Sequence, residues 1–376
     1  MSDQIVFINQ NSGYLMIDII NAHRGKYKTR AFITGKLTAR NVPLDSDVKV
    51  EKIVTYNRTT TIKRLWTWGW AFVQILFLVK TKYRKADLYI VSNPPFAPLL
   101  PLFCSNRFFI LTYDVYPDAL VEYKIMKADS FVIRLWKRAN RKIFARAAKL
   151  FTLSEGMKTL LSQYADASKI EVAPLWTDNT FLKPVDKHEN KFIAANGLQG
   201  KFLVMYSGNL GFTHNLEMLV EAAARLRNNQ VQFVIIGEGD KKKMLEERIA
   251  SYGLTNCLML PWQDVQMLPY SLSAADLAVV TLGKEASLLS VPSKTYNLMS
   301  VGAPMLCLAS KHSELAALIA KYGMGRCFED TELDAMVAFI EEIAARPDYQ
   351  RKLHTNALAA STEFGPENAH KLIAVS

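Results

Sequence analysis

The sequence predicts an α/β protein made of two parallel-sheet domains. Short apolar runs rich in β-branched and aromatic residues alternate with longer helical patterns, and this alternation pauses at a polar stretch and then restarts. Such alternation is typical of right-handed β-α-β crossovers and therefore of parallel sheets covered by helices. With 376 residues, 50% of them apolar and 22% charged, the chain fits two domains of ordinary size and excludes a disordered or collagen-like protein.

The expected elements follow in chain order. In the first half we expect strands over 5–8, 31–34, 48–54, 88–91, 108–112, 150–153 and 170–173. In the second half we expect strands over 202–206, 232–236, 257–260, 277–280 and 305–308, with helices over 215–226, 241–251 and 293–301. Beyond residue 331 the pattern is helical. The predicted organisation is a Rossmann-like domain over 1–183, a linker over 184–200, a second Rossmann-like domain over 201–345, and helices over 346–376 that return toward the first domain.

One apolar stretch, 65–79, requires a test for a membrane span. It has fifteen residues between basic flanks, whereas a spanning helix needs roughly 18 to 25. A buried crossover helix is one interpretation. The other is an interfacial anchor, because Trp66, Trp68 and Trp70 stand beside basic residues.

Charge is unevenly distributed along the chain. Residues 1–185 contain 28 Lys and Arg against 14 Asp and Glu, a net charge of +14, whereas the remainder contains 18 against 21, a net charge of −3. This division indicates an anionic partner for the front half, such as a nucleic acid, a phosphorylated substrate or the inner face of a membrane. A solvated basic helix over 134–149 is the alternative.

Cysteine usage and the N-terminus indicate the compartment. The four cysteines are scattered and form no C-x-x-C pair, so neither a disulfide framework nor a cysteine-ligated zinc site is indicated. The first residues lack the basic and apolar order of a signal peptide. We expect a cytoplasmic protein, with peripheral contact to the inner membrane face as an option.

Three motifs in the second half could hold a phosphate. Tyr206-Ser-Gly-Asn-Leu-Gly211 and Ile236-Gly-Glu-Gly-Asp240 each follow an expected strand. Glycine turns allow a ligand to approach free backbone amides at a helix start, where the helix dipole favours an anion. In the third motif we expect Ser293 to cap a helix, and Lys294 opposes the dipole in the first turn, which suggests a bound phosphate.

In this order and spacing, the three motifs resemble glycosyltransferase family 4, whose members are retaining nucleotide-sugar transferases with the GT-B fold. Leu260-Pro-Trp-Gln263 resembles the loop that contacts the nucleobase, which adds Trp262 to the donor residues Gly208, Gly211, Gly237 and Glu238. In the front half, Asp87-Leu-Tyr-Ile-Val-Ser-Asn-Pro-Pro95, Tyr113-Asp-Val-Tyr-Pro-Asp118 and Phe151-Thr-Leu-Ser-Glu-Gly-Met157 resemble a subgroup that builds bacterial capsule, O-antigen and exopolysaccharide units. The resemblance implies a nucleotide-sugar donor, a saccharide or lipid-diphosphate-linked acceptor, and no cofactor or metal.

The sequence departs from the family at the donor site. The two glutamates usual in the family correspond to Leu289 and Asn297. Asn297 could hydrogen-bond a ribose, and Glu285 is the nearest candidate for the lost sugar contact. A usual arginine and lysine are replaced by Asn209 and His214, which leaves Lys294 as the leading cation for the diphosphate.

On the acceptor side, Asp114 and Asp118 follow the strand 108–112, and either could orient the attacking hydroxyl. Asp114 is our first choice, and the alternative for Asp118 is a helix cap before Ala119. The resemblance adds Gly13 and Tyr14, in a glycine-containing loop, and Asn93 as acceptor contacts.

Other function classes fit the sequence less well. A dinucleotide dehydrogenase is set aside because no G-x-G-x-x-G follows the first strand. A nucleotide-sugar epimerase of the same architecture and a non-catalytic nucleotide-sugar-binding subunit remain alternatives, the latter because the glutamates are missing. No nucleic-acid-binding motif and no metal motif is found.

Overall fold

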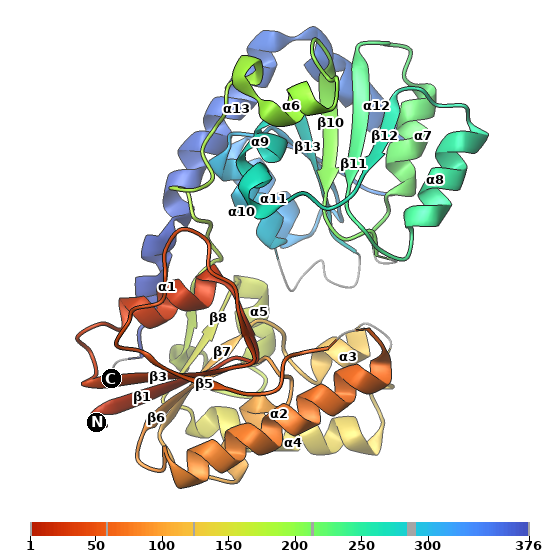
Figure 1. Ribbon diagram of the computed structural model, residues 1–376. Coiled ribbons are helices and arrows are strands. Elements are labelled where there is room, and N and C mark those ends of the chain that lie inside the picture. Colours follow the sequence, from red (N-terminus) through yellow and green to blue (C-terminus); the bar gives the residue numbers. More distant parts are fainter. Residues whose placement is uncertain (1, 58, 123–124, 212–213, 284–290, 375–376) are drawn as a thin grey trace. The chain divides into compact units, whose positions relative to one another are not determined.

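The structure is a computed structural model that describes residues 2–57, 59–122, 125–211, 214–283 and 291–374 (Figure 1). It contains two compact units, each with its own parallel sheet. Unit 1 comprises Met1–Leu175 and Pro366–Ser376, and unit 2 comprises Trp176–Gly365. The stretch expected as a linker contains η3 (Lys187–Glu189) and α6 (Lys191–Ala195) and belongs to unit 2.

Asn190 explains why this stretch is ordered. Its buried side chain accepts hydrogen bonds from the amides of Phe192 and Ile193, which caps α6, and it donates one of 2.8 Å to the carbonyl of Tyr270. A satisfied cap of this kind stabilises a helix start by about 1 kcal/mol.

Unit 1 is built on a seven-stranded parallel sheet of order β5-β3-β1-β6-β7-β8-β9. Its strands are β1 (Gln4–Ile8), β3 (Thr29–Thr34), β5 (Lys49–Lys52), β6 (Asp87–Val91), β7 (Phe108–Thr112), β8 (Lys149–Thr152) and β9 (Ile170–Val172). The short strands β2 (Asn11–Ser12) and β4 (Lys36–Leu37) pair separately. β6 and β7 are buried along their whole length, as expected of central strands covered on both faces.

Helices cover both faces of the unit 1 sheet (Figure 1). They are α1 (Tyr14–Ala22), α2 (Thr61–Thr81), α3 (Asp118–Glu122), α4 (Phe131–Arg146) and α5 (Glu155–Leu161), with the 3-10 helices η1 (Ala97–Leu102), η2 (Ala167–Lys169) and η7 (Pro366–Leu372). α2, η1, α4 and α5 share one core with the strands, whereas α1 contacts η7.

The chain end is held in unit 1 by two specific hydrogen bonds. The backbone amide of Ala374 donates 2.8 Å to Nε2 of buried His23, and the Tyr27 hydroxyl donates 2.8 Å to the Ala374 carbonyl. His23 also bonds the Ile19 carbonyl through Nδ1 at 2.7 Å. Burial lowers the pKa of His23 to about 4, so the ring is neutral and can accept the Ala374 amide.

Unit 2 has a six-stranded parallel sheet of order β12-β11-β10-β13-β14-β15. Its strands are β10 (Phe202–Ser207), β11 (Val231–Ile236), β12 (Cys257–Leu260), β13 (Leu277–Thr281), β14 (Met305–Leu308) and β15 (Gly325–Phe328). The edge strand β15 was missed by the sequence analysis because its four residues carry no strong apolar alternation.

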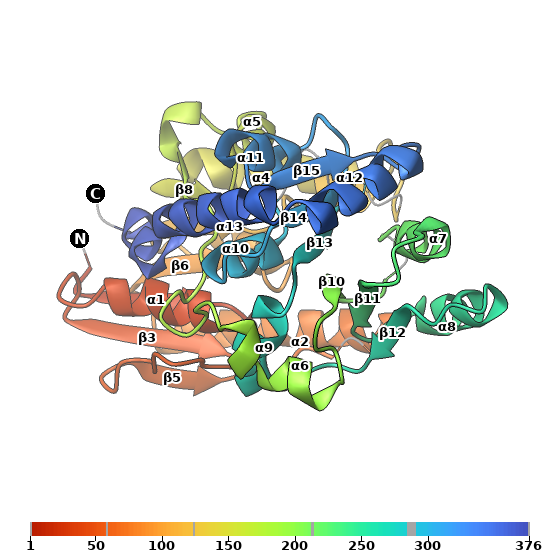
Figure 2. The same cartoon turned by 90° about the horizontal axis from the view of Figure 1, so that it is seen from above.

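Helices also lie on both faces of this sheet (Figures 1 and 2), with α7 beside α8 and α12, and α10 beside α13. They are α7 (Glu217–Arg225), α8 (Lys242–Ser251), α9 (Leu268–Ser273), α10 (Ser293–Ser300), α11 (Glu314–Tyr322), α12 (Leu333–Ala345) and α13 (Pro347–Ser361), with η4 (Val265–Met267) and η6 (Thr362–Phe364). The helical pattern beyond residue 331 is confirmed.

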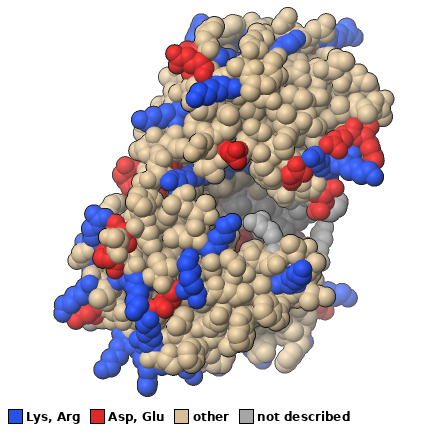
Figure 3. All heavy atoms as spheres, in the orientation of Figure 1, with Lys and Arg blue, Asp and Glu red and all other residues tan. Residues whose placement is uncertain are grey.

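The apolar stretch 65–79 lies inside the long helix α2. One side of α2 enters the core through Thr67, Ala71, Ile75 and Val79, and the opposite side is exposed. No helix among the described residues is long and apolar enough to cross a membrane. On the face drawn in Figure 3, Lys and Arg side chains gather over unit 1, in keeping with the charge of its sequence.

Candidate donor and acceptor sites

The glycine motifs meet at one edge of the unit 2 sheet. β10 lies between β11 and β13, and all three strands run parallel, so the segments after Ser207, Ile236 and Thr281 leave the sheet at the same edge. The chain moves outward from β10 to β12 and then returns to β13 on the other side of β10. Open α/β sheets bind ligands at such a reversal of strand order.

The two glycine turns pack backbone against backbone. The amide of Gly208 donates 3.0 Å to the Ile236 carbonyl, and the amide of Leu210 donates 2.9 Å to the Glu238 carbonyl. Gly237 and Gly239 have φ values of +149° and +153°. A Cβ on Gly237 would lie 1.9 Å from the Gly208 carbonyl oxygen, and one on Gly239 would lie 2.6 Å from the Leu210 backbone. Glycine is therefore required in the second turn to let the first turn approach it.

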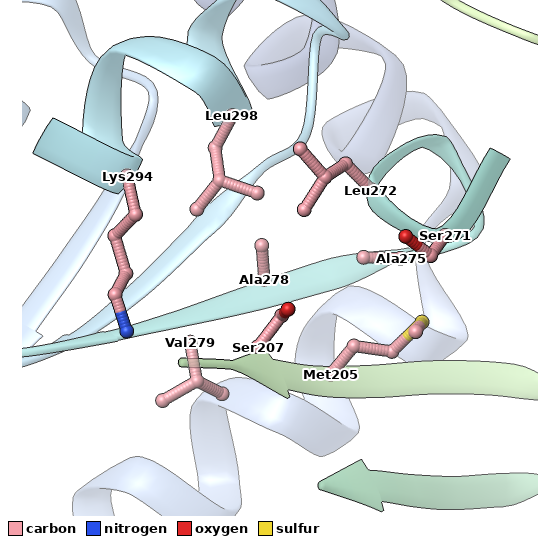
Figure 4. Close-up of a pocket in the computed structure, with 9 residues that line it drawn as sticks. All are labelled: Met205, Ser207, Ser271, Leu272, Ala275, Ala278, Val279, Lys294 and Leu298. Carbon is pink, nitrogen blue, oxygen red and sulfur yellow. The ribbon is translucent and has the colours of Figure 1, made fainter. Parts of the chain in front are cut away.

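Lys294 reaches this edge from the first turn of α10. Its ammonium Nζ is 4.0 Å from the centroid of the Tyr206 ring, and a Cβ on Gly208 would lie 2.3 Å from it. Figure 4 shows the side chain extending from α10 toward the strands that carry Ser207 and Val279. Among the described residues, no acceptor lies within hydrogen-bond distance of this buried Nζ.

Burial lowers the pKa of Lys294 to about 7. An ammonium that is removed from water without an acceptor is costly, and an anion beside Gly208 would supply both charge and acceptors. The adjoining cavity in Figure 4 has a volume of about 20 Å³, which is enough for a water molecule but far too little for a nucleotide. Its lining comprises Met205, Ser207, Ser271, Leu272, Ala275, Ala278, Val279, Lys294 and Leu298.

The expected cap of α10 is wrong. α10 begins at Ser293, so the residue in the cap position is Pro292, and no side chain caps the first amides. Ser293 is exposed in the first turn. Uncapped amides at a helix start are donors that an anion can satisfy.

His214 lies beside Lys294 and is neutral. Its Nδ1 is 2.7 Å from the Thr281 hydroxyl, and its ring centroid is 6.5 Å from that of Tyr206. Burial, together with the charges of Lys294 and Lys241, lowers the pKa of His214 to about 4. The ring can therefore offer one hydrogen bond but no positive charge at neutral pH.

The loop around His214 is held by polar contacts. The Tyr206 hydroxyl donates 2.7 Å to the Asn209 carbonyl. Lys241 donates 2.8 Å to the His214 carbonyl and pairs with Glu217 at 2.8 Å. Tyr206 and Thr281 are thus the neighbours of Lys294 and His214, and neither was among the expected site residues. The one available signal was the place of Tyr206 directly before the glycine motif.

The remaining expected donor residues differ in exposure and in their hydrogen-bond partners. The side chain of Asn209 is exposed, and Gly211 follows it in the same turn. Glu238 pairs with Lys242 at 2.9 Å, and Trp262 follows β12 with 54% of its surface exposed.

Asn297 lies one turn beyond Lys294 on α10, and its side-chain oxygen accepts a 2.6 Å hydrogen bond from the buried Thr177 hydroxyl. The oxygen keeps a second lone pair and the amide nitrogen keeps its two N–H donors, so a ribose hydroxyl can still hydrogen-bond Asn297 without displacing Thr177. The expected sugar contact Glu285, and Leu289, lie outside the described residues.

In unit 1 the expected acceptor residues follow three neighbouring strands. The order β1-β6-β7 places the loop with Gly13 and Tyr14, then Asn93, then Asp114 at one edge of the sheet. Asn93 is hydrogen-bonded to the segment just before this loop. Its side-chain amide donates 3.3 Å to the Asn11 carbonyl, and its backbone carbonyl accepts 2.9 Å from the Gln10 amide. The Arg40 guanidinium lies 3.9 Å over the Tyr14 ring. Arg40 was not predicted.

Asp114 and Asp118 differ in how far they are committed to other groups. The backbone amide of Asp114 donates 3.3 Å to the Ser92 hydroxyl, its side chain reaches the surface, and partial removal from water raises the pKa of its carboxyl. Asp118 is the first residue of α3, and its carboxylate pairs with Lys137 at 2.8 Å and accepts from the Tyr164 hydroxyl. Asp118 thus ties α3 to α4 and to Tyr164, which follows α5, whereas Asp114 retains an accessible carboxyl.

No group of three or more possible metal-ligating side chains is found in the part of the chain that the structure describes.

Comparison with known proteins gives the family of unit 2. Residues 188–359 match the family model described as glycosyl transferases group 1. The chain is 27% identical over 356 residues to the probable glycosyltransferase WbjE of Pseudomonas aeruginosa, covering 90% of this chain and 88% of that protein. It is 33% identical over 150 residues to the putative colanic acid biosynthesis glycosyl transferase WcaI of Escherichia coli K12, covering 40% of this chain and 37% of that protein.

Among solved structures, the fold is similar to that of Anabaena Alr3699/HepE, crystallised with UDP. The TM-score is 0.73 at 15% identity over 99% of this chain and 98% of that one. The same protein with UDP-glucose gives a TM-score of 0.72 at 16% identity, again over 99% of this chain and 98% of that one. The expected fold class is confirmed, because the chain has the GT-B fold of these structures, and the sequence resemblance is confirmed for the second half, where residues 188–359 are a glycosyl transferases group 1 domain.

Proposed function

We propose that this protein transfers a sugar from a nucleoside diphosphate sugar to a hydroxyl group of a saccharide or lipid-linked saccharide, with retention at the anomeric carbon, in bacterial surface polysaccharide synthesis. The observation that carries the donor class is the buried, unpartnered ammonium of Lys294 against Gly208. The complexes of Alr3699/HepE with UDP and UDP-glucose support the same class, and the name of WcaI supports the pathway class.

In this proposal the diphosphate lies at the carboxyl edge of the unit 2 sheet. The amides of Gly208 and Leu210 are used in the packing of the two turns. The amides of Asn209 and Gly211 and those at the start of α10 therefore donate to the diphosphate oxygens, and Lys294 supplies the positive charge. Charge on the diphosphate grows as the bond to the sugar breaks, so a fixed cation there stabilises the transition state more than the ground state.

His214 adds one neutral donor to this site. Its Nδ1 is engaged with Thr281, which leaves Nε2 as the ring atom available to a ligand. A neutral ring avoids placing a second positive charge beside Lys294.

On the acceptor side, Asp114 orients the attacking hydroxyl. Its accessible carboxyl, in contrast to the paired carboxylate of Asp118, is free to accept the hydroxyl proton in a hydrogen bond. In the retaining mechanism that the family resemblance implies, the departing phosphate takes that proton, and Asp114 is then an orienting group.

Calorimetry tests the donor site. Lys294→Met should weaken binding of UDP-glucose, or of whichever nucleotide sugar gives the largest thermal shift, by roughly 5- to 150-fold, which corresponds to about 1 to 3 kcal/mol for a charge-assisted hydrogen bond. The matched control is Lys243→Met, since that side chain is 88% exposed on α8 and should leave affinity unchanged. Equal affinity of the Lys294→Met variant and the wild type would refute the assignment.

A turnover assay tests the reaction. The transferase should release nucleoside diphosphate only when an acceptor is added, and NMR of the product linkage should show the anomeric configuration of the donor. Conversion of the free nucleotide sugar without acceptor would favour an epimerase, and tight binding without turnover across acceptors would favour a binding subunit.

A further inference from the structure

The exposed side of α2 carries a continuous apolar stripe. Ile62, Trp66, Trp70, Val73 and Phe77 are spaced three or four residues apart and therefore lie along one helix face. Ile62, Trp66 and Phe77 are exposed by 80%, 62% and 66%. A helix at a protein surface normally turns polar side chains to water, so this arrangement needs an explanation.

The apolar stripe is not the side of α2 that packs against the sheet, because a separate side of the helix makes the core contacts. The core contacts are made by Thr67, Ala71, Ile75 and Val79, on the opposite side of the helix. The indole rings of Trp66 and Trp70 stack on each other, with centroids 6.4 Å apart, and remain at the surface.

Two neighbouring elements extend the exposed apolar surface. η1 contacts both α2 and α4, and the rings of Phe72 and Phe103 meet edge to face with centroids 5.9 Å apart. Half of the Phe103 surface is exposed at the end of η1, and Phe131 and Leu135 are exposed by 72% and 54% at the start of α4. We call the exposed sides of α2, η1 and α4 the docking face.

The charge of the docking face has one sign. Neither α2 nor α4 contains an Asp or a Glu. Lys63 and Lys80 are exposed on α2, and Arg134, Arg138 and Arg141 are exposed on α4. Within the described ranges, none of these five forms an ion pair with an acidic side chain.

We propose that the docking face binds an anionic lipid bilayer, with α2 lying in the interface plane. Exposed tryptophans beside lysine and arginine match a membrane interface, where the rings enter the headgroup layer and the cations meet lipid phosphates. α2 cannot cross the bilayer while its other side fills the unit 1 core, and no described helix is apolar enough to do so. A second copy of the chain is disfavoured because two such faces would bring like charges together.

This inference concerns unit 1 and stands without the donor site. Its test is sedimentation of the full chain with vesicles of phosphatidylcholine alone or with 30% phosphatidylglycerol. The protein should pellet with the anionic vesicles at low salt, leave them as salt is raised, and remain in solution with the neutral ones. Tryptophan emission should shift to the blue on binding, and brominated lipid should quench it.

Two sets of variants separate charge from apolar insertion. The triple variant Arg134→Gln/Arg138→Gln/Arg141→Gln should bind anionic vesicles about 100-fold more weakly, at roughly fivefold per cation. Its control removes three cations exposed on unit 2, Lys243→Gln/Arg351→Gln/Lys352→Gln, and should bind as the wild type does.

The variant Trp66→Ser/Phe77→Ser should lose roughly tenfold or more in affinity, together with most of the quenching by brominated lipid. Its control is Tyr252→Ser/Val265→Ser, which removes exposed apolar side chains of unit 2. Nucleotide-sugar affinity, measured in solution, should be the same in all four variants, so that failure here is distinguishable from failure of the donor site.

Equal sedimentation with neutral and anionic vesicles would overturn the role of the cations. Absence of binding to both, or equal loss in a variant and its control, would overturn the proposal as a whole. Concentration-dependent self-association that Trp66→Ser/Phe77→Ser abolishes, without vesicle binding, would assign the face to a second copy instead.

Discussion

Donor binding should depend on pH in a way set by one residue, Lys294. The pKa of its ammonium is lowered to about 7 by burial, and a bound diphosphate would raise it again by pairing with the charged form. Observed affinity then follows the fraction of protein in which Lys294 is already protonated. That fraction is about nine tenths at pH 6 and about one thirtieth at pH 8.5, so affinity should fall about 30-fold over this range.

No described neighbour of Lys294 with a shifted pKa titrates between pH 6 and pH 8.5. The pKa of His214 is lowered to about 4, and burial raises the pKa of Tyr206 to about 12. Neither changes charge between pH 6 and pH 8.5. A nucleotide sugar is the right probe because its diphosphate, esterified at both ends, does not titrate in this range, whereas the terminal phosphate of free UDP does.

Calorimetry at several pH values, in buffers matched for ionic strength, measures this dependence. Lys294→Met should bind weakly at every pH, with a flat profile. Lys294→Arg should also give a flat profile, because a guanidinium stays protonated throughout. A flat profile for the wild type, or a 30-fold fall that persists in Lys294→Met, would refute the reasoning.

The same residue links function to stability. Because the folded-state pKa of Lys294 is depressed below its usual 10.5, the unfolded chain binds the proton more strongly between pH 7 and 10.5. The ligand-free protein should therefore gain stability as pH rises through this range. Lys294→Met should increase the free energy of unfolding at pH 7 by an amount on the order of 1–4 kcal/mol, and the melting temperature should rise accordingly, while donor binding is lost.

Three further perturbations test the fold and the acceptor site. The pKa of buried His23 is lowered to about 4, so the unfolded chain takes up the proton at a higher pH than the folded one. Unit 1 should therefore lose roughly 3 kcal/mol of unfolding free energy as pH falls from about 6.5 to about 4. In His23→Gln this loss, measured by calorimetry, should be smaller. Gly237→Ala should cost roughly 3 kcal/mol or more in urea unfolding, because its Cβ would meet the Gly208 carbonyl, while Gly253→Ala, in open space at φ +61°, should cost roughly 1 kcal/mol. Asp114→Asn should reduce turnover and leave donor affinity and melting temperature intact, whereas Asp118→Asn, which breaks the contacts to Lys137 and Tyr164, should lower the melting temperature. The reverse outcome would exchange their roles.

Much of the fold was predictable because a central parallel strand is buried on both faces. A run such as 108–112 must then be apolar throughout, and the sequence shows it directly. The meeting of the two glycine turns at one sheet edge was predictable for a similar local reason, since each turn directly follows a strand of the same parallel sheet. The short edge strand β15 and the cap of α10 were not, because edge strands need little apolar alternation and Ser293 is the first residue of the helix itself, which leaves Pro292 in the cap position.

By itself the sequence determined the two α/β units, the glycine turns, the basic character of the front half and the choice of Lys294 as a candidate cation. Only the tertiary structure decided that Lys294 reaches Gly208, that Asp118 is held by Lys137 while Asp114 is accessible, and which side of α2 faces water. The physical reason is the same in each case. The local sequence pattern determines the secondary structure of a residue and the chemistry of its side chain. The partner of that side chain, by contrast, comes from a segment far away in the chain, and only tertiary packing determines which face of the helix or strand that segment covers.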